Sequence, residues 1–311
     1  MYLKSYEIVT FTGLKNEWIN LLNNQSIIVM RYFVVDAFTR EAFGGNPAGV
    51  VMVDGEFPGE ELMRLVAAEL RYSETAFVRL DELNEFTVRY FTPAGEVDLC
   101  GHATIAAFHV LWLLGRLREE CPITNHTLAG DLLVRIDRRV MMQMAPPRAL
   151  DVPVDMEQLH AIMAPGARVE WTDMPVEVVS TGLPDIIMPV DGVEALNALS
   201  PDMAALTALS EALDVVGVHA FALTDDGFTA HVRNFAPRYD IPEESATGTA
   251  NAALTYYLQR RGLITCPAQC RFMQGEAMGR PSVVDTALRE DGDIWVGGDA
   301  CIVAEGDLLS R

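Results

Sequence analysis

The sequence predicts an α+β protein in which one arrangement, a group of mainly antiparallel strands around a buried helix, is made twice. The chain has 311 residues, a length typical of two domains. Half of its residues are hydrophobic, which is enough for two cores. The segment Arg89–Pro93 (RYFTP) is repeated at Arg233–Pro237 (RNFAP), and each copy leads into a helix that opens on a glycine, Gly101 or Gly248. An internal repeat of this kind indicates two halves that face one another.

Apolar runs separated by turn formers predict the strands of the N-terminal half. The helix that begins at Gly101 is apolar almost all round, so it is predicted to be buried, and Gly115 ends it. Leu62, Leu65 and Val66 have the spacing of an amphipathic helix that covers one face of the sheet. The predicted strands are 31–36, 48–53, 75–80, 86–91, 132–136 and 140–144, and the predicted helices are 59–70 and 101–114.

The same patterns predict the C-terminal half, whose helix at 246–258 again has a body of small and apolar residues. Further helices are predicted at 156–163 and 203–213, and strands at 176–179, 186–190, 216–223 and 228–235. From Arg271 the chain alternates like a strand to Ile302, with turns predicted at Asp291-Gly292 and Gly297-Gly298.

The domain boundaries follow from these elements and from a proline-rich linker at 145–147. Residues 1–29 are predicted to be an N-terminal extension, 30–147 the N-terminal domain and 148–299 the C-terminal domain. Periodicity leaves open whether the last strand, at about 300–311, returns to the N-terminal domain.

Charge and composition favour a small-molecule protein of the cytoplasm. The formal net charge of −21 argues against nucleic acid or an anionic membrane as partner. Five scattered cysteines are typical of a reducing compartment. Neither a signal peptide nor an apolar run long enough to span a membrane is apparent. Cys266 and Cys270 have no second Cys or His pair at zinc spacing, so no metal site is predicted there.

The chemistry-bearing residues lie around the two helix starts. Cys100 and His102 place a thiol and an imidazole beside free backbone N–H groups, Glu74 lies at the mouth of a strand, and Glu244 and Thr249 flank the second helix start. If the halves pair about an approximate two-fold axis, these groups meet in one cleft around a small anionic substrate. A carboxylate base and helix-end N–H donors are what proton abstraction next to a carboxylate needs. Exclusion of water is predicted to raise the pKa of a glutamate base towards neutrality.

Each candidate also has an ordinary structural interpretation. Glu74 could be a solvated strand-edge residue, His102 a helix cap and Cys100 an inert buried thiol. Glu244 could be favoured by the helix dipole alone, and Asn46 could only shape its turn. These residues taken singly leave both interpretations open.

Taken together, six sequence blocks resemble the phenazine-biosynthesis PhzF-like isomerases, which belong to the diaminopimelate epimerase-like superfamily. The blocks keep one order from about Met30 to the helix after Ala250, which is more specific than any single motif. They are 36–38 (DAF), 43–50 (FGGNPAGV), 73–77 (SETAF), 89–93 (RYFTP), 96–104 (EVDLCGHAT) and 243–250 (EESATGTA).

The resemblance implies two domains of one fold, each with a central helix inside a strongly curved sheet, and a cleft between them. It also implies a homodimer and catalysis without metal or organic cofactor. Glu74 matches the proton-shuttling glutamate of the family and His102 its active-site histidine. Glu244 stands where the family commonly has Asp, and Thr249 where it commonly has Ser. The predicted substrate-binding positions are Asn46, Cys100, Gly101 and Gly248.

The superfamily also supplies a competing mechanism, in which two cysteines at the helix starts act as opposed acid and base. Cys100 resembles the first cysteine, but Thr247 occupies the second position, and its hydroxyl is too weak an acid or base for that role. The predicted function is therefore a cofactor-independent isomerase in which Glu74 moves a proton on a small carboxylate-bearing metabolite. The alternatives are a Cys100-dependent dehydratase or epimerase of the proline racemase type and a non-catalytic metabolite-binding protein. Substrate identity stays open.

Overall fold

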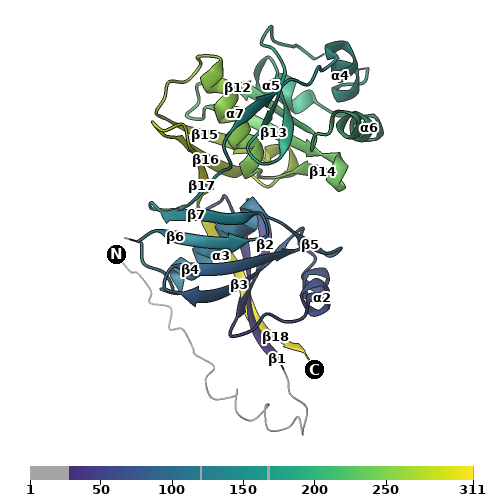
Figure 1. The fold of residues 1–311 in the computed structure, drawn as a ribbon. Helices are drawn as coiled ribbons and strands as arrows, with labels where there is room; N and C mark the ends of the chain where they lie inside the picture. Colours follow the sequence, from purple (N-terminus) through teal and green to yellow (C-terminus); the bar gives the residue numbers. More distant parts are fainter. Residues whose placement is uncertain (1–27, 120, 167–168, 311) are drawn as a thin grey trace, which may run out of the picture.

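The computed structural model describes residues 28–310 apart from 120, 167 and 168. It confirms the predicted α+β class, with two lobes that each wrap a mainly antiparallel sheet around one buried helix (Figure 1). The central helices are α3 (Gly101–Leu113) and α7 (Gly248–Arg260). The predicted extension 1–29 lies outside the described residues, except for Ile28 and Val29, with which β1 begins.

The N-terminal lobe is organised by α3, whose apolar residues are buried on nearly every side. It ends before Gly115, which has a positive φ of 63°, as the sequence predicts. On the outer face α2 buries Met63, Val66 and Ala67, whereas Leu65 is 50% exposed, so the predicted apolar face was wrong at that residue. The other elements are β1 (Ile28–Ala37), β2 (Asn46–Val53), α2 (Glu60–Leu70), β3 (Thr75–Glu82), β4 (Glu85–Phe91), β5 (Glu96–Val97), β6 (Ile123–Thr127), β7 (Gly130–Ile136) and β8 (Val140–Gln143).

The C-terminal lobe repeats this plan around α7 and adds three outer helices, which pack a second apolar cluster against the far face of the sheet (Figure 1). Its elements are β9 (Arg148–Leu150), α4 (Met156–Met163), β10 (Glu177–Ser180), β11 (Pro184–Pro189), α5 (Gly192–Ala198), α6 (Met203–Leu213), β12 (Val218–Leu223), β13 (Ala230–Ala236), a 3₁₀ turn (Pro237–Tyr239), β14 (Ile241–Glu244), β15 (Ala268–Gln274), a second 3₁₀ turn (Glu276–Met278), β16 (Ser282–Leu288) and β17 (Ile294–Gly298). The strand that follows, β18 (Ala300–Ser310), belongs to the N-terminal lobe.

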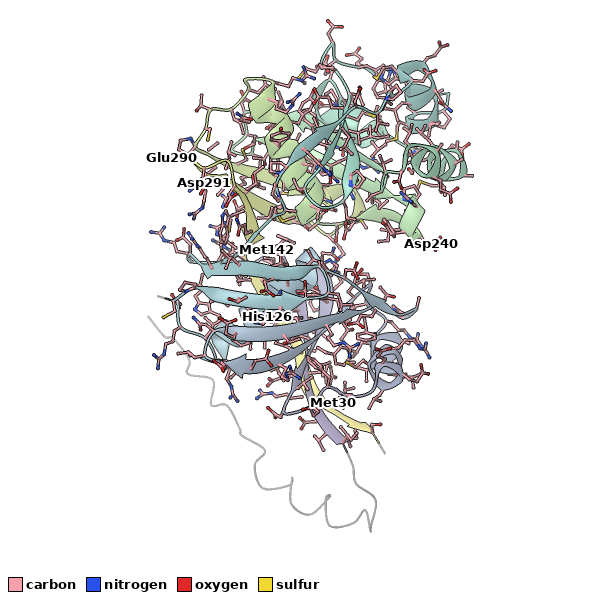
Figure 2. All side chains as sticks on the ribbon, viewed as in Figure 1. Met30, His126, Met142, Asp240, Glu290 and Asp291 are labelled. Carbon is pink, nitrogen blue, oxygen red and sulfur yellow. The ribbon has the colours of Figure 1, made fainter. Side chains whose placement is uncertain are left out.

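Two strand pairings join the lobes. Met142 of β8 lies opposite Val296 of β17, at the level where the lobes meet (Figure 2). The last strand, β18, then runs antiparallel to β1 along its whole length, from Ala37↔Ala300 to Ile28↔Ser310 (Figure 1). The chain therefore ends in the N-terminal lobe. Among the helices of the described part of the chain, none has the length and apolar character needed to cross a membrane.

The turn predicted at Gly297-Gly298 is wrong, because both residues belong to β17 and pair with β8. A Cβ at Gly297 would lie 2.0 Å from the carbonyl oxygen of Val140, and one at Gly298 would lie 2.8 Å from the Phe38 ring. These glycines thus allow the two lobes to approach closely rather than turning the chain.

A matching ion pair in each lobe supports the internal symmetry. Arg89 Nε donates to Glu96 Oε1 at 2.7 Å, and Arg233 Nε donates to Glu243 Oε1 at 2.9 Å. In both lobes a second guanidinium nitrogen reaches the other carboxylate oxygen. Each pair holds the strand before the turn against the short strand that leads into the central helix. Glu243 is therefore a structural partner of Arg233.

Candidate active site

The two central helices begin alike. Cys100 and Thr247 are the N-cap residues, both extended, with φ of −140° and −128°, and neither side chain caps its helix. Gln274 Oε1 accepts the N–H of Thr247 at 3.0 Å. Within the described residues no acceptor is found for the next backbone N–H groups, so each helix start offers free donors to a ligand. These donors belong to Gly101, His102, Gly248 and Thr249.

Glu74 and His102 form the centre of the site. Glu74 immediately precedes β3, and its carbonyl oxygen accepts from Gly49 of β2 at 3.2 Å, which fixes its backbone. Its Oε2 lies 3.2 Å from Nε2 of His102, with the side chains 16% and 4% exposed. That oxygen has no well-aligned hydrogen bond within the described part of the chain. Ser73 Oγ lies 3.4 Å from the same ring nitrogen. Oε2 is therefore buried against the His102 ring, and the exposed part of the Glu74 side chain does not include this oxygen.

Glu244 approaches His102 from the other lobe. Its Oε1 lies 3.7 Å from Nδ1 of His102, so the imidazole stands between two carboxyl groups. Asn46 Nδ2 donates to Glu244 Oε1 and to the carbonyl oxygen of Ala246, both at 3.0 Å. The hydroxyl of Thr247 donates to Glu244 Oε2. Asn46 thus extends from the N-terminal lobe and holds the start of α7 in place.

The remaining predicted site residues differ in their surroundings. A Cβ at Gly101 would meet no atom within 4 Å, whereas one at Gly248 would lie 3.2 Å from Val296. Gly101 therefore borders open space and Gly248 is packed. Thr249 accepts at its backbone oxygen from Thr181 Oγ1 at 2.9 Å. Among the described contacts, none joins the Thr249 side chain to Glu74, His102 or Glu244, so the structure does not bring it into the cluster.

The charges of Glu74 and His102 depend on one another. Burial acts to raise the pKa of Glu74, but its interaction with His102, together with Ser73 and Cys100, lowers the pKa below its ordinary value. Burial acts to lower the pKa of His102, and its interactions with Cys100 and Glu74 raise that pKa well above the ordinary value. The expectation that water exclusion raises the pKa of the base is wrong for Glu74, because a charged imidazolium lies beside it.

Glu244 and Cys100 are both shifted towards their neutral forms. Burial, and after it the negative charge of Glu74, raise the pKa of the Cys100 thiol to about 11. Burial is also the main cause that raises the pKa of Glu244, against the lowering effect of His102. At neutral pH Glu74 and His102 are therefore both charged, and the Cys100 thiol beside them is protonated.

A metal ion fits this cluster poorly. Glu74, Cys100 and His102 offer ligand atoms that lie within 4.8 Å of one another. However, Cys100 Sγ lies 3.4 Å from Nδ1 and 3.8 Å from Nε2 of His102, so the sulfur is beside the ring. A metal at Nε2 would lie about 2.1 Å outside the ring on the Glu74 side, beyond the bonding distance of about 2.3 Å from the sulfur. Binding of all three groups would require the ring to turn.

Two further polar residues at the start of α7 were missed in the sequence. Gln274 of β15 has no motif that marks it, yet it contacts Thr247, Asn251 and the backbone of Glu244. Asp185 did have a signal, because Gly182–Asp185 (GLPD) repeats the pattern of Gly45–Ala48 (GNPA). A groove of about 530 Å³ between α4 and α6 lies on the outer face of the C-terminal lobe, away from these residues.

Comparisons with known proteins agree with the fold. The family model described as phenazine biosynthesis-like protein, PhzC-PhzF, matches residues 35–306. An uncharacterized isomerase of Clostridium acetobutylicum is 33% identical over 299 residues, covering 89% of this chain and 97% of that protein. A PhzF-family phenazine biosynthesis protein of Bacillus anthracis has a TM-score of 0.82 at 26% identity, with 91% of this chain and 100% of that chain covered. A hydroxyproline epimerase of Agrobacterium vitis has a TM-score of 0.57 at 14% identity, with 92% and 93% covered, a likeness of fold alone.

Proposed function

The chain belongs to the phenazine biosynthesis-like PhzC-PhzF family, and from this premise we propose that it is an isomerase that moves a proton on a small carboxylate-bearing metabolite. The reaction takes place in a cleft between the two lobes and uses the side chains of the protein alone. The observation that carries the proposal is the contact between Glu74 and His102 at the start of α3, opposite Glu244 of the other lobe.

Glu74 acts as the base. It is ionised at neutral pH because its interaction with His102, whose ring nitrogen lies 3.2 Å from its Oε2, lowers its pKa. A carboxylate of low pKa holds an abstracted proton only briefly, because its conjugate acid is strong. It therefore returns the proton readily to a second carbon of the same substrate, as a proton shuttle requires.

His102 and the helix starts stabilise the negative charge that develops. The imidazolium of His102 lies next to Glu74, where an enolate-like oxygen of the substrate can accept from it. The substrate carboxylate binds to the free N–H groups at Gly101 and Gly248, with Thr249 beside the second of these. Open space at Gly101 supports that placement.

Glu244 positions the substrate or relays the proton from the opposite side. Asn46 and Thr247 hold its two oxygens, and burial raises its pKa, so Glu244 holds a proton more readily than a glutamate in water does. It can then donate to the substrate face that Glu74 does not reach.

A Cys100-dependent dehydratase or epimerase is the second enzymatic candidate, favoured by the position of Cys100 Sγ 3.4 Å from Nδ1 of His102. Two observations speak against it. The raised pKa of the Cys100 thiol leaves little thiolate at neutral pH, and the Thr247 hydroxyl is engaged with Glu244.

The cytoplasmic location and the homodimer remain predictions.

Exchange of solvent deuterium onto carbon tests the proposal. The protein is incubated in deuterated water with a panel of small unsaturated and amino-substituted carboxylates, and each is followed by NMR. Incorporation that depends on Glu74 supports the isomerase. Incorporation lost in Cys100→Ser but kept in Glu74→Gln would establish the second candidate instead. Ligands that bind without any exchange would indicate a metabolite-binding protein.

A further inference from the structure

A layer of four polar side chains lies buried beneath the first turns of α7, and we call it the polar layer. Each of the four is at most 1% exposed, and each has one side-chain atom without a hydrogen-bond partner among the described residues. Unpartnered buried polar atoms are costly, so a cluster of them requires an explanation. The layer and its unpartnered atoms are Asp185 (Oδ1), His219 (Nε2), Asn234 (Nδ2) and Asn251 (Oδ1).

The strand register places the layer on one side of the sheet. His219 of β12 pairs with Asn234 of β13, and its Nδ1 lies 3.1 Å from Asn234 Oδ1. Ile187 of β11 pairs with His219, and Asp185, two residues earlier, has the same side-chain direction as Ile187. Asn251 of α7 faces them and donates to the carbonyl oxygen of Thr247 at 2.9 Å.

The N-terminal lobe shows that the fold does not need these groups. In the N-terminal lobe Ala76 pairs with Val50 on one side and with Tyr90 on the other. In the C-terminal lobe His219 pairs in the same way with Ile187 and with Asn234. The positions of Asp185 and His219 therefore correspond to Ala48 and Ala76. The other two correspond to Tyr90 and Thr104, whose hydroxyl groups hydrogen-bond to each other at 2.6 Å. At these four positions the N-terminal lobe has small or hydrogen-bonded side chains, and the C-terminal lobe has polar side chains that each keep an unpartnered atom.

The polar layer lies directly behind Glu244. Asn234 pairs with Glu244 across β13 and β14. Gln274 joins the two, because its Nε2 donates to the Glu244 carbonyl oxygen at 2.8 Å and its Oε1 accepts from Asn251 at 2.9 Å. At the turn before Asp185, Thr181 holds the first turn of α7 through its bond to Thr249.

The titratable groups around Asp185 do not neutralise it as a carboxylate. Burial, and after it the charge of Glu244, raise the pKa of Asp185 to about 8. Burial lowers the pKa of His219 to about 4, so this neighbour on β12 is uncharged at neutral pH. Glu177 faces the far end of α7, where it pairs with Arg260 and Arg261. On the other side of Glu244 stand His102 and Glu74.

We propose that Asp185 is a positioning residue for Glu244: it lies buried in the polar layer behind the start of α7 and keeps the Glu244 carboxyl in its working orientation. This inference rests on the proposed function. As a neutral acid Asp185 does not repel Glu244. Once ionised, Asp185 would place an unpaired negative charge in the buried region behind Glu244, which would favour a proton on Glu244 or turn its carboxyl away from Asn46 and Thr247.

The protonation state is tested without any substrate, by urea unfolding of the wild type and of Asp185→Asn between pH 5 and pH 9. A folded-state pKa above the unfolded one gives stability that is present at low pH and is lost as pH rises through about 8. The variant cannot ionise, so its urea midpoint should exceed that of the wild type by an amount that grows from pH 5 to pH 8. Asp36→Asn is the matched control. Asp36 is also buried but accepts from Arg280 and Phe43, so its loss should lower the midpoint throughout. A constant difference for Asp185→Asn would overturn the proposal.

The positioning role is tested by the pH profile of kcat/KM for deuterium exchange. The wild-type rate should fall about tenfold between pH 7 and pH 9, since one ionisation near pH 8 governs it. The rate of Asp185→Asn should stay within about threefold of the wild-type rate at pH 7 and should not fall towards pH 9. Asp185→Leu should lower kcat at every pH because it removes the polar group from the layer. If kcat/KM of Asp185→Asn falls between pH 7 and pH 9 as it does in the wild type, the positioning role of Asp185 is refuted. Because Glu74→Gln tests the base separately, the two hypotheses can fail independently.

Discussion

Nε2 of His102 lies 3.2 Å from Oε2 of Glu74, at the point where the central helix of the N-terminal lobe begins. The contact joins a residue of the helix to one of the neighbouring strand. It favours the charged form of both groups against the effect of burial: His102 lowers the pKa of Glu74, and Cys100 and then Glu74 raise the pKa of His102.

His102 is predicted to remain an imidazolium at neutral pH. Nitrogen NMR of its ring, assigned with His102→Gln, should show a protonated ring well above pH 6.5, and Glu74→Gln should bring its pKa down. His219 is an internal reference, since burial lowers its pKa to about 4. Because the folded-state pKa of His102 is raised, the ion pair stabilises the protein below pH 6.5 and this stabilisation is lost as pH rises through the folded-state value. A neutral His102 at pH 7 would contradict the proposed pairing.

Cys100 is predicted to be unreactive. With a pKa of about 11, only about one thiol in 10⁴ is ionised at pH 7, and the side chain is 8% exposed. Iodoacetamide should modify the exposed Cys121 first and leave Cys100 unlabelled in the folded protein, as read by mass spectrometry of peptides. Cys100→Ser should keep exchange activity within about tenfold of wild type. Fast labelling of Cys100 that abolishes activity would instead favour the thiol-dependent mechanism.

Two glycine substitutions should distinguish an effect on substrate binding from an effect on the stability of the fold. Gly101→Ala adds a methyl group where no atom lies within 4 Å, so the free energy of unfolding should change by less than about 0.5 kcal/mol while KM rises. Gly297→Ala places a Cβ 2.0 Å from the Val140 carbonyl oxygen and should cost about 3 kcal/mol or more. Urea unfolding and substrate titration measure the two effects. An unchanged KM in Gly101→Ala would contradict the proposal that the substrate binds at this helix start.

The repeated ion pairs should differ in strength. Arg233 is 9% exposed and also donates to the carbonyl oxygens of Leu196 and Leu199, so Arg233→Met leaves a carboxylate and two carbonyls unpaired. We expect a loss of about 3–5 kcal/mol in the free energy of unfolding. Arg89→Met should cost about 1–2 kcal/mol, since the Arg89 side chain is 22% exposed against 10% for Arg233, and its described hydrogen bonds go to carboxylates and to no backbone carbonyl. Equal losses in urea unfolding would show that burial does not set the difference.

Much of the fold follows from local patterns in the sequence. The apolar bodies of α3 and α7 predict buried central helices, and the repeat at Arg89 and Arg233 predicts two similar lobes. Gly297 and Gly298 could not be placed, because a glycine for close approach and a glycine for a turn look alike in sequence. Helix α5 was missed, since seven residues are too few to show a period.

The candidate site was predicted less completely. The motifs point to Glu74, His102 and Glu244, and the structure brings these three together with Asn46. The direction of the Glu74 pKa shift could not be predicted, because it depends on a distance to His102 across 28 residues of chain. The repeat of Gly45–Ala48 at Gly182–Asp185 marks the position of Asp185 in the sequence, but its burial is set by packing against α7 and could not be predicted.

The most direct test of the proposed mechanism compares solvent-deuterium incorporation by the wild type, Glu74→Gln and Glu82→Gln on the same carboxylate substrate. Glu82 lies at the exposed end of the strand that Glu74 precedes, so it is a control for the same chemical change. We expect Glu82→Gln to incorporate deuterium at the wild-type rate and Glu74→Gln to be slower by at least about 10²-fold, while circular dichroism and ligand binding stay unchanged. Undiminished incorporation by Glu74→Gln would contradict the assignment of Glu74 as the base.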